Sequence, residues 1–226
     1  MFHDLPAFIY PVPRLLLATN NPGKATEFRG LLEGCGWEVV TPREIGVDVD
    51  IEETGETYEE NARAKALAGT NASGLVTLAD DSGIEIEAMG GEPGVRSARF
   101  LGADATYLQR FAEIQRRLIG LPRDQRGARF VCVIAIADPT TGSVRTAMGE
   151  VWGLIADEPR GQRGFGYDPI FWVPQHSATL AELPPHQKGI ISHRARAAAP
   201  ARQILKELLH EHRGDDDPRY APSRED

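Results

Sequence analysis

The chain has 226 residues, of which 41% are hydrophobic and 26% charged, and its formal net charge is −8. This length and composition fit a globular protein of one or two domains that is long enough to bury a core. The acidic balance argues against broad electrostatic binding of nucleic acid. We therefore expect any polyanion that it binds to be small and to meet a few local cations.

The cysteines and the hydropathy pattern indicate the cellular compartment of the protein. Cys35 and Cys132 match no metal-ligand spacing and suggest no disulfide framework, so we expect both to be reduced. No apolar run approaches the ~20 residues of a membrane span. Residues 1–13 lack the basic start and the uninterrupted apolar stretch of a signal peptide. A cytoplasmic enzyme that does not bind membranes is the resulting expectation.

The first half of the chain alternates between predicted strands and helices. In chain order it contains an irregular extension with prolines, a buried strand, a helix and a second strand, at residues 1–13, 15–18, 24–33 and 37–40. Gly34 and Gly36 end the first helix. Thr57, with Glu60 three residues later, forms a capping box and predicts a second helix that ends near Gly69.

The second half begins with β-structure. A strand, a turn of sequence D-D-S-G and an alternating strand are expected at residues 75–79, 80–83 and 84–89. A helix capped by Asp104 follows and ends near Ile119. A long β-hairpin is then predicted, with strands at residues 129–137 and 144–155. The C-terminal helix is expected to be interrupted at Pro200.

These elements predict an α/β fold with a mixed β-sheet, in which early βαβ-like units are followed by antiparallel strands. Residues 14–212 are expected to form a single domain. Residues 213–226 are charged and rich in turn residues, which predicts a disordered acidic tail.

The loop after the first strand is short and polar. Its residues are Thr19, Asn20, Asn21, Pro22, Gly23 and Lys24. α/β proteins hold phosphate with a strand, a tight loop and a helix start, because N-terminal amides and a lysine converge there. The loop is not a P-loop, since Ala18 and Ala25 occupy positions where G-x-x-x-x-G-K-[ST] needs Gly and Ser or Thr. Two interpretations stay open at this point: a phosphate-binding loop, and an Asn-rich helix cap with a solvated lysine.

Acidic residues near strand ends suggest a metal. Glu52 and Glu53 lie in the loop before the second helix, and Asp80 and Asp81 end a predicted strand. Mg²⁺ is commonly held by one or two carboxylates together with substrate phosphates. Neighbouring strand residues point to opposite faces, and the more polar face is that of Asp81. We therefore expect Asp81 to face the site and Asp80 the body of the protein, with a solvated turn as the alternative.

Two further segments carry candidate side chains. Lys65 lies one helical turn after Asn61, so both face the same way, although a solvated helix face is the alternative. The segment GFGYDPIF combines flexible glycines with Phe165 and Tyr167, which makes it a candidate wall for a flat ring, or a loop that packs on the core.

The segment KGIISHRARA places a cation, a titratable donor and a planar guanidinium together, at Lys188, His193 and Arg194. A solvated basic face and a structural histidine are the alternatives for these residues. Each signal is ambiguous alone. A lysine loop after a strand, paired acids, an aromatic loop and this cluster together predict a site for a nucleoside triphosphate with Mg²⁺.

The order and wording of these motifs resemble those of the inosine triphosphate pyrophosphatases, which hydrolyse the non-standard purine nucleotides dITP, ITP and XTP. The matching segments are ATNNPGKATE, EETGETYEENARAKA, LADDSGIEIEAMGGEPGVRSARF, GFGYDPIF, TLAEL and KGIISHRARA, within residues 15–199. The resemblance implies an elongated mixed β-sheet with helices on both sides and two lobes around a central nucleotide-binding groove. It also implies a homodimer.

The resemblance assigns roles to individual residues. Asp81 is the implied catalytic carboxylate, and Glu53 and Asp81 are the implied metal ligands, with Glu52 as the alternative to Glu53. The implied substrate-binding residues are Thr19, Asn20, Asn21, Pro22, Gly23, Lys24, Lys65, Ser82, Phe165, Gly166, Tyr167, Asp168, Lys188, His193 and Arg194.

These assignments predict metal-assisted hydrolysis of a purine nucleoside triphosphate to the monophosphate and pyrophosphate. Mg²⁺ held by Glu53 and Asp81 would polarise the phosphates, and the lysines would take up charge on the pyrophosphate portion. The alternatives are a phosphotransferase that passes the γ-phosphate to an acceptor and a nucleotide sensor without turnover. The missing P-loop frame counts against the phosphotransferase.

Overall fold

The computed structural model describes residues 12–49 and 53–213, so most of the predicted N-terminal extension, Glu52 and the predicted tail lie outside the described residues. In the described part a seven-stranded mixed sheet has the order β2-β1-β3-β4-β5-β6-β7. The strands are β1 (Arg14–Leu17), β2 (Glu38–Val40), β3 (Val76–Ile86), β4 (Gly127–Ala137), β5 (Val144–Ile155), β6 (Phe171–Val173) and β7 (Ala178–Thr179). β1 is parallel to β2 and β3, and the other pairs are antiparallel.

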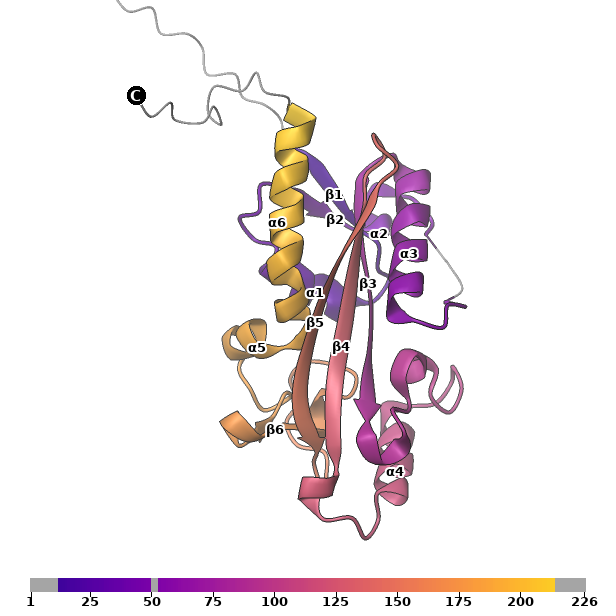
Figure 1. The fold of residues 1–226 in the computed structure, drawn as a ribbon, viewed down its shortest axis with the longest axis vertical. Helices are drawn as coiled ribbons and strands as arrows, with labels where there is room; N and C mark the ends of the chain where they lie inside the picture. The colour runs from indigo at the N-terminus through magenta and orange to yellow at the C-terminus, as the bar shows by residue number, and fades with distance from the viewer. Residues whose placement is uncertain (1–11, 50–52, 214–226) are drawn as a thin grey trace, which may run out of the picture.

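Helices cover both faces of the sheet (Figure 1). They are α1 (Pro22–Leu31), α2 (Pro42–Ile45), α3 (Tyr58–Ser73), α4 (Tyr107–Arg117), α5 (Pro185–Ile191) and α6 (His193–Arg213). Short 3₁₀ helices are η1 (Glu87–Met89), η2 (Gly94–Arg99), η3 (Arg123–Gln125), η4 (Asp168–Ile170) and η5 (Pro174–His176). α3 packs on β3 and β4 from one face, and α6 packs on β5 and β4 from the other, beside α1. None of the helices in residues 12–49 and 53–213 has the length and apolar character of a membrane span.

The long strands β3, β4 and β5 run through the length of the molecule and join two lobes (Figure 1). The lobe at the top of this view contains β1, β2, α1, α3 and α6, and one apolar cluster fills each side of its sheet. The lower lobe contains α4 and β6, with an apolar cluster that includes Phe111, Phe130 and Phe171. The predicted α/β class and mixed sheet with helices on both sides are confirmed, as is the long hairpin of β4 and β5.

The predicted D-D-S-G turn is wrong, because β3 continues without interruption through these four residues. β4 offers a pairing partner to each of them, with Asp80 opposite Ile134 and Gly83 opposite Val131. Tertiary pairing thus overrides the local preference of these residues for turns. Gly83 serves close packing instead, since a Cβ there would overlap the carbonyl oxygen of Gly94 in η2.

The second predicted helix starts as expected but ends later. Thr57 and Glu60 form the capping box of α3. The helix passes through Gly69 and ends at Ser73, and its C-cap Gly74 adopts a left-handed conformation with φ of 67°. Gly69 lies inside the helix because the sheet is close: a Cβ there would be 2.7 Å from Thr77 Cγ2. A glycine that looks like a helix end in the sequence is therefore a packing residue.

Two other helix predictions are corrected. The N-cap of α4 is Thr106, which forms a capping box with Gln109, and not Asp104. α6 continues through Pro200 without a break. Pro200 is exposed, whereas Ala197, Ala198 and Ala201 of the same helix are buried in the core cluster. Tertiary packing of this apolar side offsets the hydrogen bond that proline cannot make.

Candidate active site

The polar loop after β1 ends in a helix cap. Asn21 is the N-cap of α1, and its side-chain oxygen accepts hydrogen bonds from the backbone N–H groups of Gly23 (2.9 Å) and Lys24 (3.2 Å). Thr19 Oγ1 accepts one from the N–H of Asn21 at 3.2 Å. Pro22 occupies the first helical position, so α1 begins two residues earlier than predicted. Lys24 consequently extends from the first turn, next to the positive end of the helix dipole.

The site lies where β1 stops and β3 continues. The N–H of Ala18 still donates to the carbonyl of Leu78 (2.8 Å), and this is the last such bond before the loop leaves the strand. Asp80 and Asp81 follow on β3 beside this edge, paired with β4 on the other side. Because strand side chains alternate, the two carboxylates point to opposite faces of the sheet. Asp81 points toward α3, and Asp80 points toward α1 and α6.

On the α3 face, Asp81 belongs to a cluster with two other charged groups. Lys65 Nζ lies 2.7 Å from Glu53 Oε1 and 3.2 Å from Asp81 Oδ1, between the two carboxylates. Asn61 Nδ2 donates to Asp81 Oδ2 at 3.1 Å, and Asn61 Oδ1 accepts the N–H of Gly55 at 2.8 Å. The spacing in the sequence correctly placed Asn61 and Lys65 on one side of α3, but it assigned no role to Asn61.

The pKa shifts on this face follow from burial and from the shared lysine. Burial raises the pKa of Asp81; Lys65 opposes this shift and Glu53 adds to it. Burial also acts to raise the pKa of Glu53, but the charge and hydrogen bond of Lys65, together with the charges of Lys24 and Arg99, outweigh it, and the net shift is downward. Two carboxylates around one ammonium leave an excess of negative charge when both are ionised.

On the opposite face, Asp80 is enclosed by cations, and only 2% of its surface is exposed. Lys24 Nζ lies 3.0 Å from Asp80 Oδ1, and Arg194 Nε lies 3.7 Å from Oδ2. Ser82 Oγ donates to Asp80 Oδ2 at 3.2 Å and accepts from Arg194 Nη2 at 2.8 Å. Burial acts to raise the pKa of Asp80, but Lys24, Arg194 and Lys65 together lower it to about 2. The prediction that the two aspartates lie on opposite faces is confirmed, but Asp80 faces three predicted site residues, Lys24, Ser82 and Arg194, and not only the body of the protein.

A third cation, Lys188, joins this network from α5. Its Nζ contacts the carboxylates of both Glu27 and Asp168. Glu27 Oε2 in turn lies 3.2 Å from Arg194 Nη1. The sequence interpretation missed Glu27. The available signal was its position three residues after Lys24 on one helix, which places both side chains on the same side.

His193 is buried, with 1% of its surface exposed, and its ring stacks on Phe130 at 4.5 Å between centroids and 10° between planes. Neither ring nitrogen has a hydrogen-bond partner in the described part of the chain. Burial, and then the charges of Arg194 and Lys188, lower the pKa of His193 well below its usual range. The neutral ring therefore offers one donor and one acceptor.

The two candidate ring-binding residues of the GFGYDPIF segment, Phe165 and Tyr167, differ in their surroundings. Tyr167 is 4% exposed, and its hydroxyl donates to the carbonyl of Ser97 at 2.8 Å, so it packs on the core. Phe165 lies against the start of α1, where a Cβ on Gly23 would be only 2.5 Å from the ring. The guanidinium of Arg194 lies 4.7 Å from the centroid of Phe165. Phe165 is thus the better candidate for the predicted aromatic wall.

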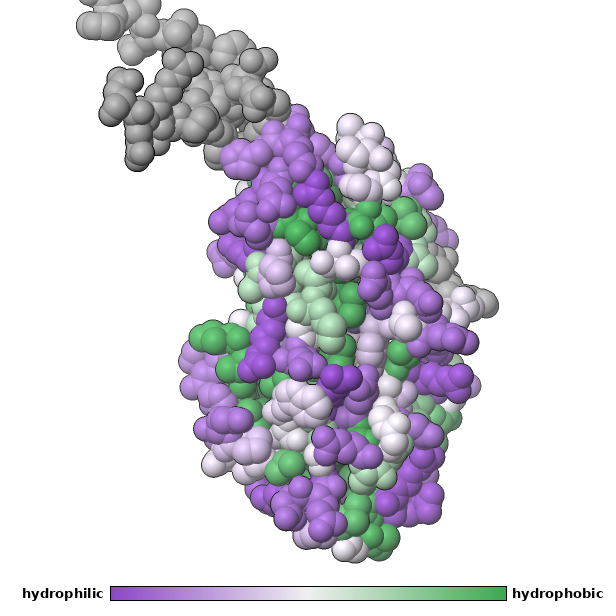
Figure 2. All heavy atoms as spheres, viewed as in Figure 1, coloured by the Kyte–Doolittle hydropathy of each residue, from purple (hydrophilic) through white to green (hydrophobic). Residues whose placement is uncertain are grey.

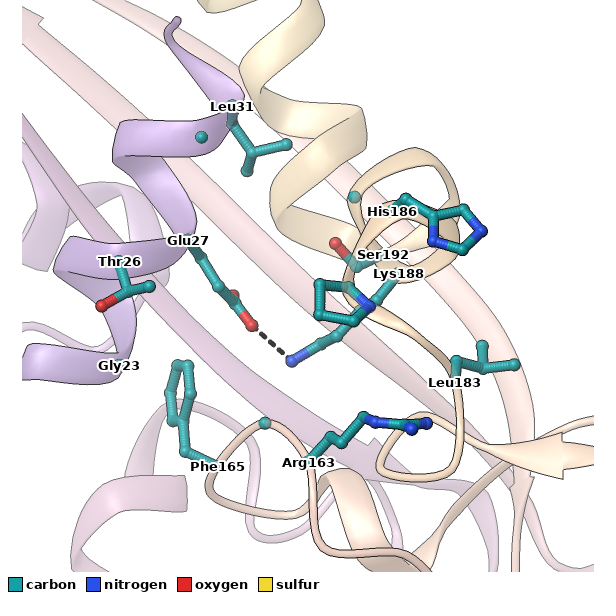
Figure 3. Close-up of a pocket in the computed structure, with 14 residues that line it drawn as sticks. Gly23, Thr26, Glu27, Leu31, Arg163, Phe165, Leu183, His186, Lys188 and Ser192 are labelled. Carbon is teal, nitrogen blue, oxygen red and sulfur yellow. Dashed lines mark hydrogen bonds and ion pairs between the residues drawn. The ribbon is translucent and has the colours of Figure 1, made fainter.

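Two cavities meet at Phe165. The larger, about 530 Å³, lies between α1, α5 and the loop before Phe165, and the paired side chains of Glu27 and Lys188 point toward each other across it (Figure 3). The smaller, about 90 Å³, is lined by many of the predicted site residues, namely Asn21, Lys24, Glu53, Asp81, Ser82, Phe165, Gly166, Tyr167, Asp168, His193 and Arg194. Phe165 is the one described residue that lines both. Thr19, Asn20, Pro22 and Lys65 line neither cavity.

This arrangement suits a compact polyanion, because lysines, a guanidinium and a helix N-terminus converge on one groove. Among residues 12–49 and 53–213, no group of three or more His, Cys, Asp or Glu residues could hold a metal ion alone. A metal at Glu53 and Asp81 would therefore need further ligands from water or from the bound anion, as is common for Mg²⁺.

Comparisons with known proteins agree with this chemistry. The profile of the Ham1 family matches residues 15–204. A protein of Desulforamulus reducens named dITP/XTP pyrophosphatase is 47% identical over 86% of this chain and 96% of its own length. The protein of that name from Bacillus subtilis is 44% identical over 84% of this chain and 96% of its own. The solved structure of a HAM1 protein from Coxiella burnetii superposes with a TM-score of 0.77 at 41% identity, and covers 86% of this chain and 99% of its own. The chain belongs to the Ham1 family.

Proposed function

We propose that the protein hydrolyses non-standard purine nucleoside triphosphates (dITP, ITP and XTP) to the nucleoside monophosphate and pyrophosphate. The relatives from D. reducens and B. subtilis carry the name dITP/XTP pyrophosphatase. The observation that carries the proposal is the division of charge at β3. Glu53 and Asp81 share one lysine on one face, while cations gather around Asp80 on the other. A triphosphate across this edge meets lysines from both faces.

The phosphate chain binds between the start of α1 and α3. Lys24 and Lys65 extend toward β3 from these two helices, and each now pairs with a carboxylate of the site. Phosphate oxygens compete for the same ammonium groups. As the bond between the α- and β-phosphates breaks, the lysines neutralise charge on the departing pyrophosphate, which lowers the barrier most in a site screened from water.

Glu53 and Asp81 fit a divalent metal. Both direct hard oxygen donors toward the same small region. Lys65 Nζ lies there, 2.7 Å from Glu53 Oε1 and 3.2 Å from Asp81 Oδ1. One lysine does not balance two carboxylates, and the excess charge favours a cation. We propose Mg²⁺ for this site, with the other ligands from water and phosphate oxygens. When bound, it would polarise the phosphates toward attack by water.

Asp81 is the proposed group that positions the attacking water and takes its proton. Its raised pKa makes it a better proton acceptor than an ordinary aspartate. Asn61 holds Oδ2 with a hydrogen bond of 3.1 Å, which fixes the orientation of the carboxylate. The water oxygen then bonds to phosphorus, and pyrophosphate leaves.

The base is read by His193 and Arg194 beside the ring of Phe165. Both ring nitrogens of His193 and Nε of Arg194 are buried, with no hydrogen-bond partner among the described residues. Hypoxanthine and xanthine present a 6-oxo acceptor, whereas adenine presents a 6-amino donor that would leave these donors unpaired. Sites built on such a bond can reject the wrong partner by ~10⁴–10⁵-fold. Guanine shares the 6-oxo group, so discrimination against GTP must depend on its 2-amino group.

A homodimer in the cytoplasm is the proposed working form. Met148 and Trp152 are 54% and 48% exposed on one face of β5. Figure 2 shows pale and green atoms gathered in the upper part of the face over β4 and β5, with hydrophilic residues beside and below them. Apolar side chains gathered on one face favour an interface. Light scattering should give twice the chain mass, and Trp152→Asp should shift it to the monomer.

The free, buried Cys35 and Cys132 fit the reducing environment of the cytoplasm.

Product identification tests the proposed reaction. Purified protein with Mg²⁺ should convert ITP and XTP to monophosphate and pyrophosphate, with ATP the poorest purine substrate and GTP poor but measurable. EDTA should abolish turnover. Chromatographic detection of a diphosphate with inorganic phosphate would refute the mechanism.

A further inference from the structure

Asp80 carries a buried charge for which the proposed reaction has no use. Lys24, Ser82 and Arg194 approach its carboxylate to between 3.0 and 3.7 Å. Cys132 Sγ lies 4.0 Å from Oδ2 on the adjacent strand. Asp80 lines neither of the two cavities, whereas His193 and Arg194 line the smaller one, so Asp80 has no surface with which to meet a substrate. Any effect on the reaction must therefore pass through these neighbours.

The two cations that Asp80 joins serve opposite ends of the proposed site. Lys24 extends from the first turn of α1, at the phosphate end. Arg194 is the second residue of α6, and its guanidinium lies beside the ring of Phe165, at the base end. Ser82, two residues after Asp80 on the same strand, also holds Arg194 at 2.8 Å. A short segment of β3 thus sets the position of both cations.

We propose that Asp80 is a positioning residue that couples the phosphate end of the site to the base end. The proposal rests on the proposed function, because that function gives Lys24 and Arg194 their ligands. Asp80 touches neither the substrate nor the metal. Without its charge, Lys24 and Arg194 lose their common partner, and the two cations repel each other. Base preference then depends on a residue that does not contact the base.

Asp80→Asn tests this coupling while keeping the shape of the side chain. We expect kcat for ITP to fall by about tenfold, because small displacements of positioned groups slow the reaction. The ratio of kcat/KM for ITP over ATP should also fall by about tenfold, since Arg194 loses a charged anchor. A metal ligand or general base would slow ITP and ATP alike and leave that ratio unchanged. Asp138→Asn is the matched control, because Asp138 is also 2% exposed but pairs with His212, outside the site.

Lys24→Met provides a second variant if Asp80→Asn does not fold. The side chain of Lys24 is 16% exposed in the wild type. In the variant Asp80 pairs with Arg194 alone, and this changes the position of the guanidinium. We expect the ITP-to-ATP ratio to fall here too, although Lys24 lies at the phosphate end. Lys65→Met is the matched control. Lys65 is a phosphate-side lysine whose ion pairs are with Glu53 and Asp81, so it should slow both nucleotides equally.

Binding of IMP and AMP, measured by calorimetry, reports base preference without turnover. A wild-type protein that releases no pyrophosphate from ITP would refute the proposed function, and the ratio of the two dissociation constants would still test the coupling. The dissociation constant of AMP divided by that of IMP should fall toward one in Asp80→Asn and Lys24→Met. It should stay at the wild-type value in Asp138→Asn. An unchanged preference in the folded Asp80 and Lys24 variants, by both rate and binding, would overturn the proposal.

Discussion

The two faces of β3 balance their charges differently. Toward α3, Glu53 and Asp81 share Lys65, and Arg99 Nη2 approaches the carboxylate of Glu53 only to 4.0 Å at the exposed rim. Toward α1 and α6, carboxylates and cations are equal in number. These are Asp80, Glu27 and Asp168 with Lys24, Lys188 and Arg194. One face is therefore short of positive charge, and the other is neutral.

This difference gives two neighbouring aspartates different chemistry. The pKa of Asp81 is raised by burial, whereas the cations around Asp80 lower its pKa to about 2. A carboxylate in negative surroundings attracts a metal ion and accepts a proton, while a carboxylate between cations holds those cations in place. Residue type alone does not assign the role, because the neighbours on each face decide it.

The largest expected effect comes from Asp81. Asp81→Asn should lower kcat for ITP by at least the ~10²-fold expected for loss of a positioned acid–base group, and by more if the metal is also lost. Asp80→Asn should cost about tenfold. Steady-state rates of pyrophosphate release on both variants measure the contrast. Two equally inactive variants would show that the faces do not divide the roles as argued.

Arg194→Ala changes the neutral face and should act on base choice. Loss of the guanidinium removes a donor to the 6-oxo group, so kcat/KM for ITP should fall by about 10–100-fold more than kcat/KM for ATP. Measurement of ITP, GTP and ATP on both proteins gives the ratio directly. If ITP and ATP lose activity in proportion, Arg194 serves the phosphates or the fold, and the base is read elsewhere.

Lys65→Met makes the α3 face more negative. With no ammonium between Glu53 and Asp81, the concentration of Mg²⁺ for half-maximal rate should fall by about threefold to tenfold, while kcat falls by about tenfold. Lys24→Met is the control, because Lys24 pairs with Asp80 on the other face and should leave the Mg²⁺ requirement unchanged. An unaltered Mg²⁺ requirement in the Lys65 variant would place the metal away from these carboxylates.

The smallest effect concerns a buried aspartate outside both faces. Asp138 accepts hydrogen bonds from Thr140 N and Thr141 Oγ1 and pairs with His212 at 3.1 Å, and these contacts lower its pKa although burial opposes the shift. A lowered pKa in the folded state stabilises the protein above the unfolded value of 3.8 and stops doing so as the pH falls through the folded value.

Asp138→Asn should therefore lower the free energy of unfolding by about 1–3 kcal/mol at pH 7, without loss of activity. The difference in Tm from the wild type should shrink below pH 4. Thermal melts at pH 7 and pH 3 measure it. A Tm difference that is equal at both values would mean that Asp138 acts through shape instead of charge.

Several features of the site are local in the sequence and could be predicted from it. The capping box of Thr57 fixes where α3 begins, and the four-residue spacing then places Asn61 and Lys65 on one side. The alternation of a strand separates Asp80 from Asp81. These predictions hold because each depends on the geometry of a single helix or strand.

Other features could not be predicted, because their cause lies elsewhere in the chain. The residues D-D-S-G favour a turn, yet β4 pairs with all four and makes them strand. Gly69 and Pro200 suggest helix ends, yet packing keeps both inside continuous helices. Glu27 follows Lys24 by about one helical turn, but its role emerges only where Lys188 and Arg194 approach it.

The sequence by itself determined the α/β class, the start of α3 at its capping box and the residue types that meet at the groove. The tertiary structure decided which carboxylate meets which cation. β1 stops at Leu17, and the loop that follows brings Lys24 to one side of β3, while α3 brings Lys65 to the other. Coulombic energies depend on distances of a few ångströms and on burial, and neither exists until these distant segments pack around the strand.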